Sequence, residues 1–193
     1  MDSDKHVERY IEKMRKIQDE FLTLINTGGN SELTCDELIF NFHKFKVLDD
    51  HDIFRSFLHL LSIIYENHHQ FKEIIKIIEN IILYYKKDIL NDFQNSDIYS
   101  IFKNDKKLLL FLLNSKILKL DRFLIRNLQI DKNTTFFYPE LKEYLKSNEN
   151  AKIEEQIPDF LEKRQIGEND SSLCEMIRND RIDQFIAYIE RTN

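Results

Sequence analysis

Histidines and cysteines are the side chains here that most readily bind metals or act as nucleophiles. His51 and His59 share one face of a predicted helix with Arg55, and His68 and His69 follow. A zinc site needs three or four converging ligands, each oriented by further hydrogen bonds. No His-Glu-x-x-His, Cys-x-x-Cys or Gly-x-Ser-x-Gly motif is present. We therefore expect no metal, no cofactor and no catalytic residue, and interpret these histidines as polar residues of a helix surface.

The two cysteines, Cys35 and Cys174, lie far apart and fit no disulfide or metal-binding pattern. Cys174 lies on the apolar side of a predicted short helix, which favours a packed thiol over a nucleophile. Two reduced, buried thiols are typical of a reducing compartment. Residues 1–10 are polar and unlike a signal peptide, and no apolar run is long enough to span a bilayer. We expect a cytoplasmic protein, with a nuclear location left open.

Positive charge is concentrated only between residues 103 and 126, which we call the basic island. Its seven basic residues are Lys103, Lys106, Lys107, Lys116, Lys119, Arg122 and Arg126. Such a set is able to contact RNA, anionic lipid or an acidic partner. However, the chain carries a net charge of −6, and aromatic residues for base stacking are sparse in this stretch. A solvated helix surface is therefore the preferred interpretation, and nucleic-acid binding the minor one.

Residues that break helices are rare in this chain. Its 193 residues include 3 Gly and 2 Pro, and 42% are hydrophobic. This composition supports a core and suits helices joined by polar turns better than hairpin strands. We predict an all-α fold, an irregular antiparallel helical array that leads into an ankyrin-like helical hairpin. Residues 1–150 form the helical N-terminal region, and residues 151–193 form a connecting helix and the hairpin, with residues 147–152 as linker.

The first two predicted helices lie on either side of a loop that contains Gly28 and Gly29. Apolar positions in residues 7–24 extend over fewer than three heptads, so packing on a globular body is preferred to a coiled coil. Thr34 is the predicted N-cap of a helix that reaches about Lys46. The apolar residues that it should bury are Leu38, Ile39, Phe42 and Phe45.

Two wide apolar stripes predict a central antiparallel pair of helices. Asp49 and Asp50 begin the third helix, because acidic side chains suit a helix N-terminus. Its predicted core residues are Ile53, Phe54, Phe57, Leu58, Leu61, Ile64 and Tyr65. The fourth helix covers residues 71–85 and carries Phe71, Ile74, Ile75, Ile78, Ile81, Ile82 and Tyr85. The spacing of three and four residues indicates helices despite the many β-branched isoleucines.

Shorter helical units follow, separated by turn-prone Asn-Asp and Asn-Ser pairs. They cover residues 98–102, 108–114 and 122–128, and residues 108–118 resemble a degenerate helical hairpin. Pro139 is predicted to begin a helix that reaches about Lys146. The same proline should hold Tyr138 in an extended conformation.

The C-terminal stretch, residues 168–193, predicts two short helices around a turn at Asn179 and Asp180. A hairpin this short cannot bury its apolar face alone and needs a neighbour on each side, as a stacked repeat has. Its apolar residues are Leu173, Met176, Ile177, Ile182, Phe185, Ile186 and Ile189. We expect part of this set to stay uncovered, and the hairpin amides to exchange faster than those of residues 53–85.

Several strings resemble a large family of protist ankyrin-repeat proteins, in which a helical N-terminal region precedes an ankyrin array. They are Lys-Arg-Gln-Ile-Gly-Glu-Asn-Asp at residues 163–170 with residues 173–193, residues 98–111, and Phe-Tyr-Pro-Glu at residues 137–140. The resemblance covers roughly residues 45–193. The Thr-Pro-Leu-His signature of a full ankyrin unit is absent. Asn193 falls where the array would continue, so the resemblance implies the start of a truncated array.

The predicted function is non-catalytic protein–protein recognition by a scaffold of the ankyrin-repeat type, with an unidentified protein as partner. Stacked helical hairpins present an extended surface whose exposed side chains give specificity. The family resemblance implies the same function. Two alternatives stay open. A small all-helical enzyme would show a deep pocket with clustered titratable groups. A nucleic-acid or anionic-surface binder acting through the basic island would show steep salt dependence.

Overall fold

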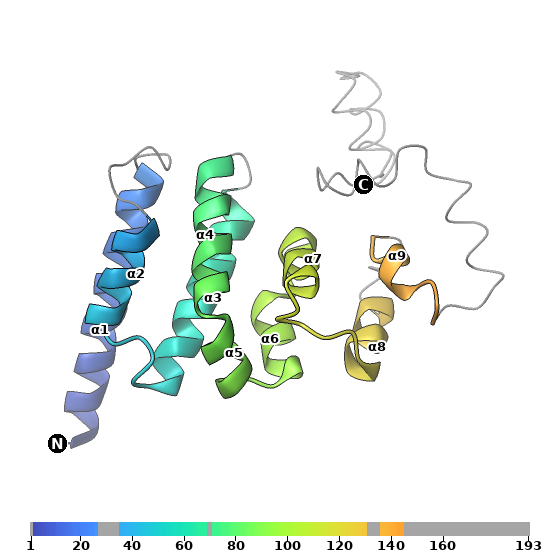
Figure 1. The fold of residues 1–193 in the computed structure, drawn as a ribbon. Helices are drawn as coiled ribbons and strands as arrows, with labels where there is room; N and C mark the ends of the chain where they lie inside the picture. Colours follow the sequence, from blue (N-terminus) through green and yellow to red (C-terminus); the bar gives the residue numbers. More distant parts are fainter. Residues whose placement is uncertain (1, 27–34, 69–70, 131–135, 145–193) are drawn as a thin grey trace, which may run out of the picture. The chain divides into compact units, whose positions relative to one another are not determined.

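The computed structural model describes residues 2–26, 35–68, 71–130 and 136–144. Every regular element within these ranges is a helix, which confirms the predicted all-α class (Figure 1). The chain divides into two compact units, Met1–Arg126 and Asn127–Asn193. The predicted linker, the boundary at residues 150–151 and the ankyrin-like hairpin all lie outside the described residues.

The described helices of the first unit follow one another with short connections. They are α1 (Asp2–Asn26), α2 (Cys35–Lys44), α3 (His51–Asn67), α4 (Lys72–Tyr84), α5 (Lys86–Asp92), α6 (Asn95–Phe102) and α7 (Lys106–Asn114). Helix α8 (Arg122–Ile130) begins in this unit, and α9 (Tyr138–Leu141) belongs to the second unit.

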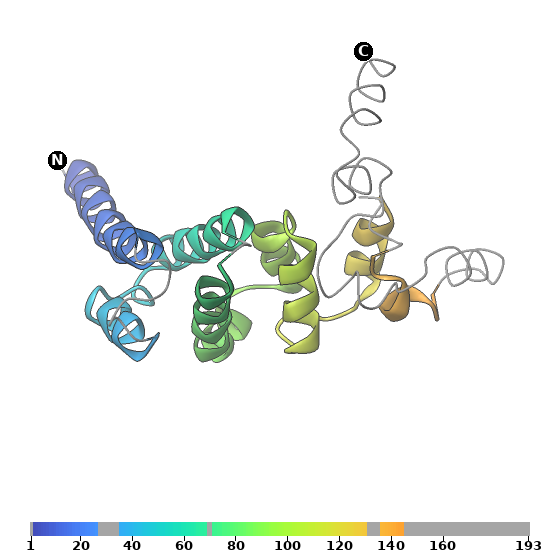
Figure 2. The ribbon, with the colours of Figure 1, turned by 90° about the horizontal axis from the view of Figure 1, so that it is seen from above.

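The first unit is built as two rows of helices. Helix α3 packs against both α1 and α6, and these three helices form the first row. Helix α2 packs against α4 in the second row, and contacts of α3 with α4 and of α6 with α7 join the rows. Figure 2 shows α1, α3 and α6 along one side, and α2, α4 and α7 along the other. Successive helix pairs are thus stacked, as they are in helical repeat arrays.

The predicted pairing of the third and fourth helices is confirmed by the contacts of α3 with α4. Asp50 caps α3, since its carboxylate accepts hydrogen bonds from the backbone N–H groups of Asp52 at 2.9 Å and Ile53 at 3.2 Å. Every core residue predicted for α3 is buried. In α4 the fully buried residues are Ile74, Ile78, Ile81 and Ile82, whereas Ile75 is half-buried and Phe71 is exposed.

Aromatic rings from both rows meet in the core, and we call Phe21, Phe42, Phe54, Phe57 and Tyr85 the aromatic cluster. The ring centroid of Phe57 lies 4.9 Å from that of Phe42, 6.1 Å from that of Phe21 and 5.6 Å from that of Tyr85. All five side chains are buried. Tilted and edge-to-face pairs of this kind add about 0.5–1.5 kcal/mol each beyond burial. The aromatic cluster therefore ties the two rows together.

The chain continues as a helix beyond the predicted end of the fourth helix, and the prediction missed α5. Only Tyr85 separates α4 from α5, with φ −83° and ψ 8°. Its N–H still donates to the carbonyl of Ile81 at 3.1 Å, and its carbonyl accepts from the N–H of Ile89 at 2.9 Å. Helix α5 therefore continues the course of α4 with a bend (Figure 1). The run of charged residues after Tyr85 hid this continuation, because it lacks a clear apolar stripe.

The predicted degenerate hairpin over residues 108–118 is wrong. Helix α7 ends at Asn114, and Lys116 adopts a left-handed conformation with φ 58°. The N–H of Lys116 donates to the carbonyl of Leu113 at 3.0 Å, and the N–H of Ile117 donates to that of Leu112 at 2.9 Å. These two bonds form a Schellman motif, and burial of Ile117 supplies its apolar contact. The motif turns the chain out of the helix.

The same motif ends α2 at Lys44, two residues before the predicted end at Lys46. Lys46 has φ 56°, and the N–H of Val47 donates to the carbonyl of Phe42 at 3.3 Å. Val47 is fully buried, whereas Phe45 is only half-buried, contrary to the prediction. Glycine is the residue that usually marks such an end, so neither lysine signalled it.

Helix α1 buries only part of its predicted stripe. Ile17, Phe21 and Leu24 are buried, whereas Val7 and Ile11 are exposed. The second half of α1 therefore packs on its own chain. This agrees with the prediction that the helix packs on a globular body instead of forming a coiled coil.

Helix α9 is a single turn, Tyr138–Leu141, with Pro139 in its first turn. It is shorter than the helix predicted to reach Lys146, and it begins one residue earlier. The extended conformation predicted for Tyr138 is therefore wrong. Tyr138 and Leu141, the first and last residues of this helical turn, are both buried.

Replacing Lys116 by glycine should stabilise the first unit by about 0.5–1 kcal/mol, because glycine adopts positive φ without the steric cost of a Cβ atom. The matched control is Lys76→Gly in the exposed middle of α4, which should cost about 1 kcal/mol. Denaturant unfolding measures both free energies. A loss of stability on Lys116→Gly would contradict the left-handed helix end.

Candidate functional site

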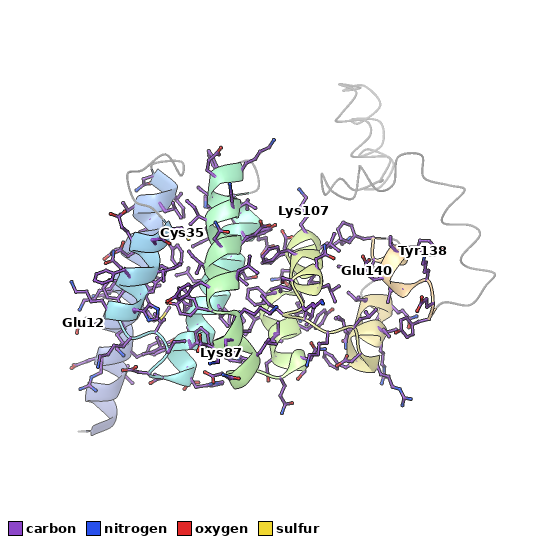
Figure 3. All side chains as sticks on the ribbon, viewed as in Figure 1. Glu12, Cys35, Lys87, Lys107, Tyr138 and Glu140 are labelled. Atoms are coloured by element: carbon purple, nitrogen blue, oxygen red, sulfur yellow. The ribbon has the colours of Figure 1, made fainter. Side chains whose placement is uncertain are left out.

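The structure distributes the basic island over the end of α6, both ends of α7, the connection that follows and α8. Lys103 follows the last residue of α6, and Lys106 and Lys107 lie in the first turn of α7. Lys116 follows the last turn, and α7 rises by roughly 10 Å between Lys107 and its last residue, Asn114. Figure 3 shows Lys107 at the upper end of α7. The other three basic residues lie in the connection to α8 and on α8: Lys119, Arg122 and Arg126.

The seven basic residues therefore come from several helices and from the connections between them, not from one helix face. All of them are exposed or half-buried. Contact of this set with an anionic partner stays a prediction.

A tertiary contact adds a lysine that lies outside the basic island. Lys86 donates from Nζ to the carbonyl of Ser115 at 2.7 Å. This carbonyl lies at the C-terminal end of α7, where the helix dipole favours a cation. Lys86 and the exposed Lys87 are therefore brought next to the chain segment that contains Lys116. The contact joins residues 29 positions apart, so no local sequence pattern indicates it.

Asn95 holds the connection between α7 and α8. Its Oδ1 accepts from the N–H of Lys119 at 2.9 Å, and its Nδ2 donates to the carbonyl of Lys119 at 2.8 Å. The same Nδ2 donates to Oδ2 of Asp121 at 2.8 Å. Asp121 in turn accepts from the N–H of Leu124 at 2.8 Å and caps the start of α8. The backbone around Lys119 is therefore fixed by side chains from α6 and from the connection itself.

A phenol and a carboxyl group pair between α3 and α4. Tyr65 donates from its hydroxyl to Oε1 of Glu79 at 3.1 Å. Burial raises the pKa of Tyr65, and the nearby Glu79 carboxylate raises it further. Burial also raises the pKa of Glu79, while the hydrogen bond from Tyr65 opposes that shift. Perturbed pairs of this kind occur at catalytic sites, but Tyr65 is only 3% exposed, so its position fits a structural role.

Tyr85 buries a hydroxyl that has no hydrogen-bond partner among the described residues. Its ring packs against His43, Phe54 and Phe57. Burial raises the pKa of this hydroxyl, and the neighbouring Tyr84 adds to the shift. Tyr84 itself shares a 2.8 Å hydrogen bond with Nε2 of His43. A buried polar group without a partner costs about 1–3 kcal/mol. Packing of the Tyr85 ring in the core therefore outweighs the cost of leaving its hydroxyl without a hydrogen bond.

The histidine face considered for metal binding has other contacts. The His51 ring centroid lies 4.7 Å from that of Phe93, and Arg55 pairs with Asp97 at 4.0 Å. Burial lowers the pKa of His59, and the charge of Arg55 adds to that effect. Across the part of the chain that the structure describes, no group of three or more His, Cys, Asp or Glu side chains is placed to hold a metal ion.

Cys35 is a half-buried free thiol, and burial raises its pKa. A raised pKa keeps a thiol protonated, so the structure gives no sign of an activated nucleophile at this position. The other cysteine, Cys174, lies outside the described residues.

Comparison with protein families, curated proteins and solved structures finds no match for this chain. The resemblance to ankyrin-repeat proteins therefore stays an expectation. In the described ranges no helix has the length and apolar character needed to cross a membrane.

Tyr85→Phe should raise the free energy of unfolding by about 1 kcal/mol, because it removes an unpaired hydroxyl and keeps the ring. Tyr65→Phe is the matched control and should lower it by about 1 kcal/mol, because Glu79 loses a donor. Denaturant unfolding shows whether each substitution raises or lowers the free energy of unfolding. Destabilisation by Tyr85→Phe would mean that the hydroxyl has a partner.

Stability should fall at alkaline pH through the same two tyrosines. Both pKa values are raised in the folded state, so the stabilisation is complete below the unfolded value of about 10 and is lost as pH rises above it. Thermal unfolding across this range should show a smaller alkaline loss for the double variant Tyr65→Phe, Tyr85→Phe than for the original chain. An equal loss would contradict the raised pKa values.

Proposed function

We propose that this chain is a non-catalytic scaffold for protein–protein interaction, with a protein as its partner. The stacking of helix pairs in two rows supports this proposal, because such an array leaves long outer surfaces. Between the rows the space is occupied by the aromatic cluster. Recognition is therefore assigned to exposed side chains rather than to an internal cavity.

Exposed apolar side chains on α2, α4 and α5 are the observation on which the proposal rests. Phe40 of α2 is 68% exposed, Tyr84 of α4 is 52% exposed, and Leu83 of α4 and Leu90 of α5 are 43% and 39% exposed. Single exposed apolar residues are common, but several on neighbouring helices are typical of an interaction surface. Phe40 and Tyr84 are aromatic, and aromatic residues supply much of the binding energy at protein interfaces.

The two alternative functions have weaker support. The basic island is spread from the end of α6 to α8 and belongs to a chain with a net charge of −6, which disfavours a broad nucleic-acid surface. An enzyme would need reactive groups that its substrate can reach. The pair with the clearest pKa shifts, Tyr65 and Glu79, includes a phenol that is almost completely buried.

Partner capture tests the proposal. The full chain, immobilised and incubated with lysate of the cells that encode it, should recover a specific protein that also binds in a purified titration. Phe40→Ser with Tyr84→Ser should weaken that binding about tenfold or more, because truncating aromatic anchors typically costs over 1 kcal/mol.

The matched control, Val7→Ser with Ile11→Ser, changes two exposed apolar residues of α1 and should leave the affinity unchanged. Circular dichroism establishes that each variant is folded. Recovery of nuclease-sensitive nucleic acid without protein, or equal binding by all variants, would contradict the proposed surface.

A further inference from the structure

We propose that the outer surface of α4 and α5 binds an acidic segment of the partner protein. Carboxylates of that segment pair with Lys76 and Lys87, and its apolar side chains contact Leu83 and Leu90. This inference rests on the proposed scaffold function and specifies the chemistry of the partner.

A single stripe of α4 and α5 faces away from the core. The buried isoleucines of α4 occupy one side of the helix, and the opposite side carries residues spaced by three or four positions. We call them the outer stripe: Lys72, Lys76, Asn80, Leu83, Lys87 and Leu90. All six are exposed. The backbone bonds of Tyr85 to Ile81 and Ile89 maintain the helical course through the junction, so the stripe continues from α4 onto α5.

The outer stripe is positive within an acidic chain. It contains three lysines and no carboxylate, whereas the whole chain has a net charge of −6. The bond from Lys86 to Ser115 holds Lys116 close to the start of α5 and adds another exposed cation. The exposed Glu73 lies three positions before Lys76 and borders the stripe, where it partly offsets the positive charge. Glu79 borders it between Lys76 and Leu83, but is half-buried and accepts a hydrogen bond from Tyr65. A local positive surface of this size complements a short acidic segment.

Apolar side chains within the outer stripe indicate that the partner segment is not purely acidic. Leu83 and Leu90 alternate with Lys76 and Lys87, and the exposed Tyr84 lies beside them. A segment that alternates carboxylates with apolar residues matches this order. Charge pairs at an exposed surface contribute little individually, so the leucines are needed for affinity.

A bilayer and a nucleic acid fit this surface less well. Two leucines provide little apolar area for insertion between lipids, and the negative net charge opposes approach to an anionic membrane. The same net charge opposes a long polyanion, whose binding requires many phosphate contacts. A protein segment needs only local complementarity.

The probe for this surface is a fluorescein-labelled peptide of repeated Glu-Glu-Leu, titrated with the full chain while anisotropy is measured. The peptide should bind, and the affinity should fall with increasing salt, because screening weakens exposed charge pairs. Peptides of repeated Gln-Gln-Leu and Lys-Lys-Leu should bind at least about tenfold more weakly. Backbone NMR spectra should place the perturbed amides in α4 and α5.

Charge-reversal variants distinguish peptide binding at this surface from nonspecific electrostatic attraction to the chain. Lys76→Glu with Lys87→Glu should weaken peptide binding about tenfold or more. The matched control, Arg9→Glu with Arg15→Glu, gives the same net charge through exposed residues of α1 and should change affinity less than about twofold. Leu83→Ser with Leu90→Ser should weaken binding several-fold without changing its salt dependence.

Absence of peptide binding, equal losses in both charge-reversal pairs, or amide shifts outside α4, α5 and the adjoining segment around Lys116 would overturn the inference. Tighter binding to anionic lipid vesicles or to a single-stranded oligonucleotide than to the acidic peptide would also overturn it. A chain that captures a protein partner but ignores the peptide would lose the acidic-segment assignment and keep the scaffold function. A chain that captures no protein would lose the scaffold function itself.

Discussion

The packing of Phe57 is the interaction on which the two-row arrangement depends. Its ring touches Phe42 from α2, Phe21 from α1 and Tyr85 from the junction of α4 and α5. Burying one such side chain is worth roughly 1.5–3 kcal/mol, more than a typical hydrogen bond between helices such as that of Tyr10 with Ser56. The rows are therefore joined mainly by apolar packing, with hydrogen bonds adding precise alignment.

This packing has a consequence for the helix that follows. Tyr85 places its ring in the aromatic cluster and leaves its hydroxyl without a partner among the described residues. The same residue is where α4 bends into α5. A ring anchored in the core at a bend determines the direction of the next helix. The position of Lys87 and Leu90 at the surface therefore depends on how Tyr85 packs.

Charge is distributed by tertiary contacts rather than by sequence blocks. The basic island looks continuous along the sequence, but α7 separates Lys106 and Lys107 from Lys116, and its last members lie on α8. Meanwhile Lys86 reaches Ser115 and brings cations of α5 next to Lys116. An acidic chain therefore presents a local positive surface that includes residues from two separate stretches. Such local surfaces give specificity for a partner, whereas the net charge governs long-range attraction.

Local physics explains what was predictable from the sequence alone. The spacing of apolar residues in α3 identified its whole buried face, because the helical period is a property of neighbouring residues. Asp50 was placed at the start of that helix for the same reason, since a cap bonds backbone groups only two or three residues away. The all-α class follows from the same periodicity together with the scarcity of glycine and proline.

Tertiary structure decided the features that depend on distant residues. Lys46 and Lys116 accept left-handed conformations because Val47 and Ile117 gain burial beyond the helix ends, which their local sequence does not reveal. The bond of Lys86 to Ser115 requires two segments to be packed first. Likewise, the spacing of Lys76, Leu83 and Lys87 places them on one side of a helix, but only the packing of the opposite side in the core leaves them exposed.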